Sequence, residues 1–294
     1  MKTALLIFGS MAILAAAFAS ETQIQGGQLW VEGQWKSDLV TVSAPGTLGG
    51  AGTVESPQVN VAGTIAPGIA PSVVGTLSVD GTLNFQAGGK YACDITGPVT
   101  SDALAVDMAS GSGQVEVNNP GGFIPVDQVI IDAFNLSDYS SFTATAGWGL
   151  RELPVEDLVL TSLTGDTDSD GLPDWCELAY TGSRTALDPN AHNDTDGVPN
   201  GDEVRAGTDP TDETSYLRIT QVREVAGGKI KIAWPSVASR WLNVANPQYE
   251  LSVSTGLITG EFTAVAGNLP STPPDNYYTN TPAATFQAWR IRKQ

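Results

Sequence analysis

Short alternations of apolar and polar residues dominate the first half of the chain. Within residues 58–61 and 75–79 every second side chain is apolar, which places one face of a strand against a core. Glycine-rich turns separate these runs, and none of them has the 3.6-residue period of a helix. The pattern predicts strands at residues 29–31, 39–42, 58–61, 75–79, 81–85, 104–106 and 114–117. Residues 22–163 are therefore expected to form an all-β domain, either a sandwich or a solenoid.

A second β-rich region covers residues 216–294. Apolar side chains alternate at Ile230, Ile232 and Trp234, and again at Leu251 and Val253. Strands are expected at residues 216–220, 229–234, 249–253, 261–265, 276–279 and 285–291. Six short strands in a segment of this length predict a small β-sandwich of the immunoglobulin-like or fibronectin type III-like kind.

The loop between these two regions has the ligand spacing of a calcium site. Carboxylates at positions 1, 3, 5, 9 and 12 of a twelve-residue loop direct their oxygens at one centre, and a glycine at position 6 allows the turn. Here those positions hold Asp166, Asp168, Asp170, Asp174 and Glu177, with Gly171 at position 6 and the carbonyl of Leu172 at position 7. The alternative is a solvated acidic linker, but such runs seldom keep this register. We therefore expect Ca²⁺ in this loop.

A degenerate second copy of the loop follows twenty-six residues later. Positions 3, 5, 7, 9 and 12 are filled by Asp194, Asp196, the carbonyl of Val198, Asn200 and Glu203. Position 1 holds His192, which is a poor ligand for calcium, so Asp188 or Asp209 is expected to supply the missing oxygen. For His192 a solvent-exposed loop position is favoured over a transition-metal site, because no cysteine or second histidine accompanies it.

Each loop continues into a short helical pattern with a proline at its start, and the patterns end at Gly182 and Gly207. A strand pattern at 158–163 precedes the first loop, so neither copy is a complete EF-hand. The loop-then-helix form, doubled and punctuated by Asp-Pro pairs, resembles the thrombospondin type 3-like calcium modules of secreted bacterial proteins. The resemblance covers residues 166–213. It implies a calcium-stiffened spacer in which Trp175, Leu178, Tyr180 and Val204 form a small core.

The sequence of the first β region also resembles a known repeat. Gly-Thr-Leu occurs at 46–48, 75–77 and 81–83, Gly-Thr-Ile occurs at 63–65, and Ser-Asp-Ala-Leu-Ala-Val follows at 101–106. These segments are similar to the autotransporter-associated β-strand repeat over residues 25–160. The resemblance implies a short right-handed parallel β-solenoid, in which each turn buries an apolar stripe against its neighbours.

The N-terminus and the charge indicate an exported protein. Lys2, the apolar run that follows it and a small-residue site ending at Ala19 predict a signal peptide over residues 1–19. No later apolar run is long enough to form a transmembrane helix. The formal charge is −18, and residues 166–213 alone carry thirteen acids against two bases. This acidity argues against nucleic acids and anionic membranes as partners. A secreted or cell-surface location is expected.

The remaining chemistry favours a structural role. Cys93 and Cys176 could form one disulfide after export or remain two buried thiols. Residues 22–163 offer only Lys36, Lys90 and Arg151 as cations, which are too scattered for a lyase site. We therefore expect a non-enzymatic, calcium-binding structural or adhesive protein whose partner is an extracellular polysaccharide or protein. The alternative is a glycan-binding or polysaccharide-degrading β-helix protein, in which Trp30, Trp35 and Trp148 would stack on sugar rings, although lone tryptophans are more often core or capping residues.

Overall fold

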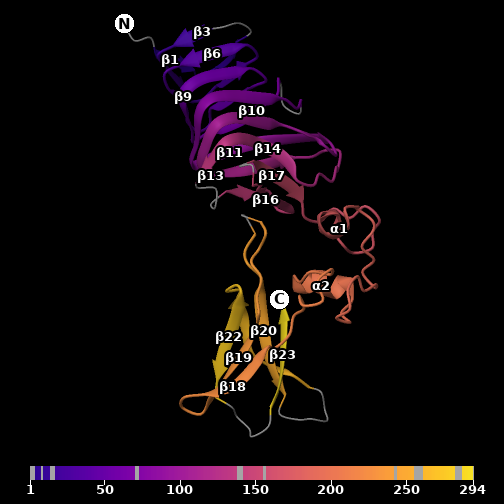
Figure 1. Cartoon of the computed structure of the whole chain (residues 1–294). Helices are drawn as coiled ribbons and strands as arrows, with labels where there is room; N and C mark the ends of the chain where they lie inside the picture. The colour runs from indigo at the N-terminus through magenta and orange to yellow at the C-terminus, as the bar shows by residue number, and fades with distance from the viewer. Residues whose placement is uncertain are drawn as a thin grey trace. The chain divides into compact units, whose positions relative to one another are not determined.

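The computed structural model describes residues 4–7, 9–13, 17–69, 73–137, 142–154, 157–241, 244–254, 261–281 and 287–293. Parts of the expected signal peptide (residues 1–3, 8 and 14–16) and the start of the last expected strand (residues 285–286) lie outside them. The chain forms two compact units, Met1–Gly165 with Trp241–Asn243, and Asp166–Arg240 with Val244–Gln294. The described chain is mainly β with two short helices, which confirms the expected fold class at this level (Figure 1).

The first unit contains one sheet of seventeen strands. Its first ten strands are short: β1 (Ala4–Ile7), β2 (Ser10–Ile13), β3 (Ala17–Ala19), β4 (Glu21–Ile24), β5 (Gln28–Val31), β6 (Gln34–Ser37), β7 (Val40–Val42), β8 (Thr47–Gly50), β9 (Thr53–Val61) and β10 (Thr64–Pro67). The later strands are β11 (Thr76–Gly97), β12 (Thr100–Ser101), β13 (Ala103–Asn118), β14 (Gln128–Ser137), β15 (Thr143–Ala144), β16 (Trp148–Glu152) and β17 (Leu158–Ser162).

Most strands of this sheet pair in parallel with a strand further along the chain rather than with the next one. At the N-terminal end the partner is three strands later, so that β1 pairs with β4, β2 with β5 and β3 with β6. The long strands continue this arrangement, because β11 lies parallel between β9 and β13, and β13 is also parallel to β14 (Figure 1). The first three strands fall within the expected signal peptide.

Residues in register on neighbouring strands stack their side chains into columns inside this unit. One column contains Leu29, Leu48, Ile65, Tyr91 and Val115, all with no exposed surface. Full burial of such a side chain stabilises the fold by about 1.5–3 kcal/mol. The alternation in the sequence therefore records which side chains face this core.

Two expected strands, at 75–79 and 81–85, lie in the single strand β11, which bends between them. Gly81 makes the bend possible. Its φ is +144°, and a Cβ there would lie 2.0 Å from the carbonyl oxygen of Ser56. At the C-terminal end of the sheet the pairing changes to antiparallel, because β17 runs opposite to both β14 and β16. β17, whose five residues are all buried, thus lies between β14 and β16.

The second unit contains two helices and two three-stranded antiparallel sheets. One sheet consists of β18 (Gln221–Val225), β19 (Lys229–Pro235) and β22 (Asp275–Asn280). The other consists of β20 (Gln248–Ser254), β21 (Thr263–Pro270) and β23 (Ala288–Lys293). A core cluster draws on both sheets, with Ile232 and Trp234 from β19 beside Tyr249 and Leu251 from β20. The rings of Trp234 and Tyr249 meet edge to face, with centroids 5.9 Å apart.

The prediction of a strand at 216–220 is wrong, because this segment forms no strand. The first strand of the sheet is β18, which begins at Gln221. Its apolar residues Leu217 and Ile219 nevertheless pack against the core of this unit. Alternation therefore identified the side chains that reach the core, but it did not show whether their backbone pairs. The strand expected at 261–265 begins two residues later, at Thr263, and continues to Pro270.

The two helices are α1 (Asp174–Thr181) and α2 (Asn200–Ala206). Pro173 and Pro199 cap their N-termini, one position before the first helical residue. Gly182 and Gly207 end them in the left-handed conformation, with φ of 74° and 79°, as the sequence predicted. No helix within the described residues is long and apolar enough to cross a membrane.

Candidate calcium centre

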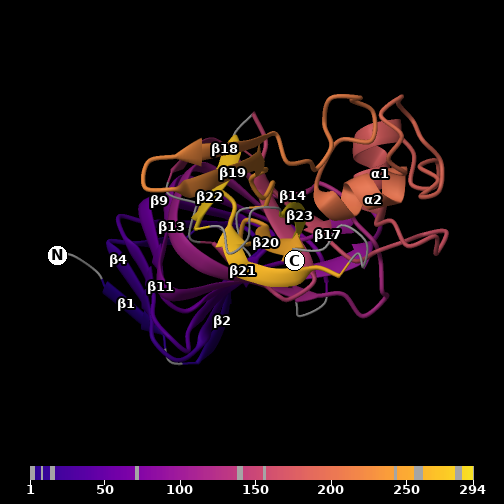
Figure 2. The same cartoon turned by 90° about the horizontal axis from the view of Figure 1, so that it is seen from below.

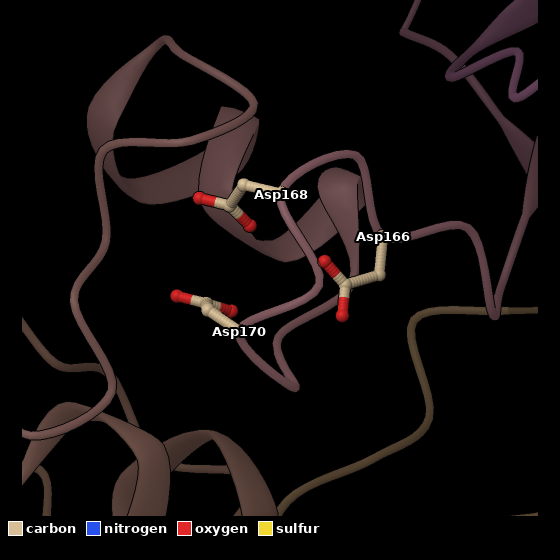
Figure 3. Close-up of side chains that lie close together, drawn as sticks. All are labelled: Asp166, Asp168 and Asp170. Atoms are coloured by element: carbon tan, nitrogen blue, oxygen red, sulfur yellow. The ribbon is translucent and has the colours of Figure 1, made fainter.

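Three aspartates of the first loop bring their carboxylates together. Each of Asp166, Asp168 and Asp170 offers one oxygen, and these oxygens lie within 4.8 Å of one another (Figure 3). The loop is held by its own backbone, because Asp166 accepts hydrogen bonds from the amides of Ser169 (2.7 Å) and Gly171 (3.0 Å). Gly171 has a φ of +97°, the conformation for which glycine was expected at position 6.

Asp174, at position 9, has a different set of contacts. One of its oxygens accepts the amide of Thr167 at 2.7 Å, and the other accepts the hydroxyl of Thr167 and the guanidinium of Arg184 at 2.9 Å. The side chain of Asp174 has no exposed surface, whereas that of Arg184 is 31% exposed. Asp174 is thus neutralised by Arg184 and ties the start of the loop to the first turn of α1.

Glu177, at position 12, follows on the same helix and is completely buried. Its Oε1 accepts the amide of Leu187 at 3.1 Å, while its Oε2 has no hydrogen-bond partner among the described residues. Burial raises the pKa of Glu177, and the charges of Asp168 and Asp170 raise it further. Leu172, whose carbonyl is the predicted ligand at position 7, buries its side chain beside Cys176 and Leu187.

The second loop forms a more enclosed cluster from Asp194, Asp196 and Glu203, again within 4.8 Å. Oδ1 of Asp194 accepts a hydrogen bond from the backbone amide of Asp196 at 3.1 Å, and Oδ1 of Asp196 accepts one from the amide of Val198 at 2.7 Å. The Oδ2 atoms of Asp194 and Asp196 are buried and have no partner in the described structure. Each aspartate therefore uses one oxygen for a hydrogen bond that stabilises the loop, while its other oxygen is buried without a donor.

Glu203 gives the strongest indication that a cation is needed at this cluster. It is fully buried, and both of its carboxylate oxygens lack a hydrogen-bond partner among the described residues. Burial raises the pKa of Glu203 to about 7. The next causes are the negative charges of Asp196, Asp194 and Asp209. A buried carboxylate without a donor is costly unless a cation compensates it.

Among the alternatives for the missing ligand, Asp209 is electrostatically close to Glu203, whereas Asp188 is not among the groups that shift its pKa. The side chain of Asp209 accepts the amide and hydroxyl of Thr211. Asp188 caps the amide of Asn190 at 2.8 Å. Neither side chain belongs to the cluster, and of the two only the charge of Asp209 contributes to the raised pKa of Glu203.

The other predicted positions of the second loop also make contacts within the chain. Asn200 accepts the amide of Asn193 at 2.9 Å and donates to the carbonyl of Asp188 at 2.8 Å. Nδ1 of His192 lies 3.0 Å from the carbonyl oxygen of Val198, so the exposed histidine closes the loop. The clusters therefore unite six predicted ligand side chains. The other five lie outside them, namely Asp174, Glu177, Asp188, Asn200 and Asp209.

The sequence reasoning missed the link between positions 2 and 9. Thr167 donates its amide to Asp174, and Asn193 donates its amide to Asn200 in the same way. Both pairs are seven residues apart, so the repeated spacing was a signal that could have been read. The ion pair from Arg184 had no counterpart in the second copy and could not have been found this way.

The expected small core of this segment is largely present. Trp175, Tyr180 and Val204 pack against a buried cluster of Leu172, Cys176 and Leu187, while Leu178 is not part of it. Cys93 and Cys176 are both buried free thiols, which is the second of the two alternatives. Burial raises the pKa of Cys176 to about 12, so its thiol is protonated at neutral pH.

The three tryptophans considered for sugar stacking are in different environments. Trp35 is only 3% exposed, and its indole donates to the buried hydroxyl of Thr22, so it belongs to the core. Trp30 and Trp148 are half-buried. Trp30 lies against the backbone of Gly49, where a Cβ would meet the ring at 2.4 Å. Trp35 is therefore removed from the candidates for glycan contact.

Both loops present the donors that a hard divalent cation requires. Both clusters consist of carboxylates alone, without a thiolate or an imidazole. Five buried carboxylate oxygens in the two loops lack a hydrogen-bond partner among the described residues. A search against models of protein families and against curated proteins found no match for this chain.

Proposed function

We propose that residues 166–213 bind about two Ca²⁺ ions and that calcium orders this segment as a rigid spacer. The observation that carries this proposal is the set of buried, unpartnered carboxylate oxygens on Glu177, Asp194, Asp196 and Glu203. Calcium would supply the positive charge and coordination that these oxygens lack. Asp166, Asp168, Asp170 and Glu177 would hold the first ion, and Asp194, Asp196, Glu203 and Asp209 the second.

Calcium suits these loops better than magnesium. Ca²⁺ accepts six to eight oxygens in a flexible arrangement, whereas Mg²⁺ requires near-ideal octahedral geometry and keeps several waters. The loops offer irregularly spaced carboxylates on a turn and on the first turn of a helix. Extracellular calcium modules often have Kd values of about 10⁻⁴–10⁻³ M. The spacer would therefore be ordered at extracellular calcium concentrations and loosened by chelation.

The role of calcium in this proposal is mechanical. Without an ion, the carboxylates of each cluster repel one another and their buried oxygens have no donor. An ion that binds only the ordered loops stabilises them in proportion to the logarithm of its concentration above Kd. The two short helices, with seven and eight residues, are too short to be stable without this support.

For the flanking regions we propose the architecture that the resemblances imply. The parallel pairing of β4, β5 and β6 with β7, β8 and β9 supports a short β-solenoid over residues 22–163. Its hand would be right-handed, like nearly all parallel crossovers. The core shared by β19 and β20, which belong to different sheets, supports a small β-sandwich over residues 216–294.

We infer a non-enzymatic, exported protein with a structural or adhesive role at the cell surface or outside the cell. Each of the three cations of residues 22–163 is held in an ion pair: Lys36 with Glu55, Lys90 with Glu116 and Arg151 with Asp127. Cations engaged in this way are poorly placed to stabilise the anion of a lyase reaction. The inference that the protein is exported rests on the signal-peptide pattern of residues 1–19.

Limited proteolysis of the full chain tests the calcium proposal. With millimolar calcium, we expect little cutting between residues 163 and 215, and with chelator we expect cutting there to increase at least about tenfold. Magnesium at the same concentration serves as a control for ionic strength, and cutting at 119–127 serves as a control for general protease activity. Equal cutting at 163–215 with calcium and with chelator would refute the proposal.

A further inference from the structure

The sheet formed by β18, β19 and β22 (Figure 2) carries three basic side chains on one side. In an antiparallel pair, residues directly opposite each other point to the same side of the sheet. Arg223 is opposite Lys231, and Val225 is opposite Lys229, so the three cations share one side. Ile232 and Trp234 alternate with them and face the core. We call this side the basic face; its residues are Gln221, Arg223, Lys229, Lys231, Tyr277 and Thr279.

The cations of the basic face are not neutralised by the protein. None of the ion pairs within the described residues includes Arg223, Lys229 or Lys231. Arg223 donates only to the neutral side chain of Gln221. Asp275 is a carboxylate on the same side of the sheet, and it is opposite Pro235. Pro235 is four residues from Lys231 along β19, which corresponds to about 13 Å. Like charges directly opposite each other destabilise a sheet. An anion bound between Arg223 and Lys231 would remove that cost.

The other bases of the C-terminal region differ from these three. Arg292 forms an ion pair with Glu250 at 2.9 Å, and Arg290 lies over the ring of Phe262. Burial lowers the pKa of Lys293. Arg292 is therefore neutralised within the chain. Arg223, Lys229 and Lys231 differ from these residues in lying together on one side of one sheet.

An aromatic ring lies beside the cations. Tyr277 is 65% exposed, and the ammonium of Lys231 lies 4.2 Å from the centroid of its ring. Tyr277 is opposite Ala233, and Thr279 is opposite Lys231, so the ring stands on the same side as the cations. The free side of an exposed aromatic ring can stack on the apolar face of a sugar, while amide and hydroxyl groups bond its hydroxyls. Gln221 and Thr279 provide such groups.

We propose that the basic face binds an acidic polysaccharide, with its carboxylate or sulfate groups on Arg223, Lys229 and Lys231 and a sugar ring on Tyr277. Charge complementarity favours a polyanion here, because residues 214–294 carry eight bases against four acids and three of these bases share this face. The exposed ring of Tyr277 beside the cations favours a glycan over an acidic peptide, which would need pockets for side chains. The proposal names a partner for the adhesive role inferred above and does not depend on calcium.

The test measures binding of the full chain to heparin and to polygalacturonate oligosaccharides, with neutral dextran as the negative control. Arg223→Gln/Lys231→Gln is compared with the matched variant Arg205→Gln/Arg290→Gln, which removes the same charge elsewhere. We expect the first variant to bind at least about fivefold more weakly and the second to retain affinity within about twofold. Circular dichroism and thermal unfolding verify that both variants fold.

Tyr277→Ala separates a glycan site from a generic anion site. We expect it to weaken oligosaccharide binding and to leave inorganic polyphosphate binding unchanged. Equal loss in both double variants would overturn the proposal, as would the absence of glycan binding by the parent chain. If Arg223→Gln/Lys231→Gln instead abolishes self-association, the acidic segment of a second copy occupies the face and the glycan proposal is wrong. Each assay is repeated with chelator, so a failure of calcium binding is distinguished from a failure of glycan binding.

Discussion

Glu203→Gln in α2 is the most direct perturbation of the second calcium cluster. Both oxygens of Glu203 are buried without a partner, beside Asp194 and Asp196. Glutamine preserves the shape of the side chain while removing its charge and one of its oxygens. The variant should therefore have opposite effects in the absence and in the presence of calcium. Asp202→Asn on the same helix is the matched control, because the Asp202 carboxylate is 55% exposed and pairs with Arg205.

The size of the effect without calcium follows from the pKa of Glu203, which burial raises from 4.5 to about 7. Each pKa unit corresponds to about 1.4 kcal/mol, so the ionised carboxylate costs about 3 kcal/mol at pH 8. Burying the glutamine amide costs about 1–3 kcal/mol. We expect Glu203→Gln to stabilise the calcium-free segment by about 1 kcal/mol at pH 8.

The sign of the pH dependence follows from the direction of this shift. Because the folded-state pKa is raised, the protonated form of Glu203 is favoured by folding. That favourable contribution is complete below the unfolded pKa of 4.5 and is lost as the pH rises through about 7. The advantage of Glu203→Gln over the parent should therefore disappear below pH 4.5.

With calcium the order is reversed. At a calcium concentration of one hundred times Kd, one site contributes about 2.7 kcal/mol of stability, and the variant should lose that contribution from the second site. Hydrogen exchange of the amides of 193–207, with calcium and with chelator, measures both effects locally. Asp202→Asn should show the full calcium-dependent protection. If Glu203→Gln and Asp202→Asn gain the same protection from calcium, the second cluster is not a calcium site.

Three further predictions concern other parts of the chain. Arg184→Ala should destabilise the spacer by about 1–3 kcal/mol because it leaves a buried carboxylate without its cation, whereas Arg205→Ala, at an exposed ion pair, should change it by less than about 0.5 kcal/mol in urea unfolding. The pKa of Asp102 is raised to about 7 by burial, so parent stability should fall between pH 3.8 and 7, and Asp102→Asn should reduce that slope. A thiol reagent should modify Cys93 and Cys176 only after unfolding, and modification of fewer than two thiols in the unfolded, unreduced chain would indicate a disulfide.

The sequence was most informative where ligand spacing and backbone geometry are tied to consecutive positions. Asp166, Asp168 and Asp170 lie on alternate residues of one tight loop, so their convergence depends on few other contacts. Glu203 also joins its cluster, because the helix that begins at Asn200 brings position 12 back to the loop. Its lack of any hydrogen-bond donor could not be read from the sequence, since burial depends on residues elsewhere in the fold.

The β regions show the same limit. Alternation predicted which residues of 58–61 and 75–79 face inward, and Val59, Val61, Leu77 and Val79 are buried. It did not predict that two expected strands form one bent strand, because the bend at Gly81 depends on the position of a neighbouring strand. Pairing partners are set by contacts between distant residues, and a one-dimensional pattern does not specify them.

Position 9 is where sequence and structure give different roles, and Asp174→Asn distinguishes them. The spacing assigns Asp174 to the ion, but both of its oxygens accept hydrogen bonds from Thr167, and one also contacts Arg184. The second loop holds an asparagine, Asn200, at this position and forms the same bond to the amide at position 2. An amide oxygen therefore suffices for the link.

If position 9 serves this link alone, Asp174→Asn should leave calcium affinity at the first loop within about threefold, which calorimetric titration measures. A loss of more than about tenfold would show that the Asp174 carboxylate acts on the ion. Asp168→Asn, at a position whose carboxylate belongs to the cluster, provides the comparison and should weaken binding. Because Asp174→Asn also removes the ion pair with Arg184, urea unfolding in chelator is needed to separate a loss of folding from a loss of affinity.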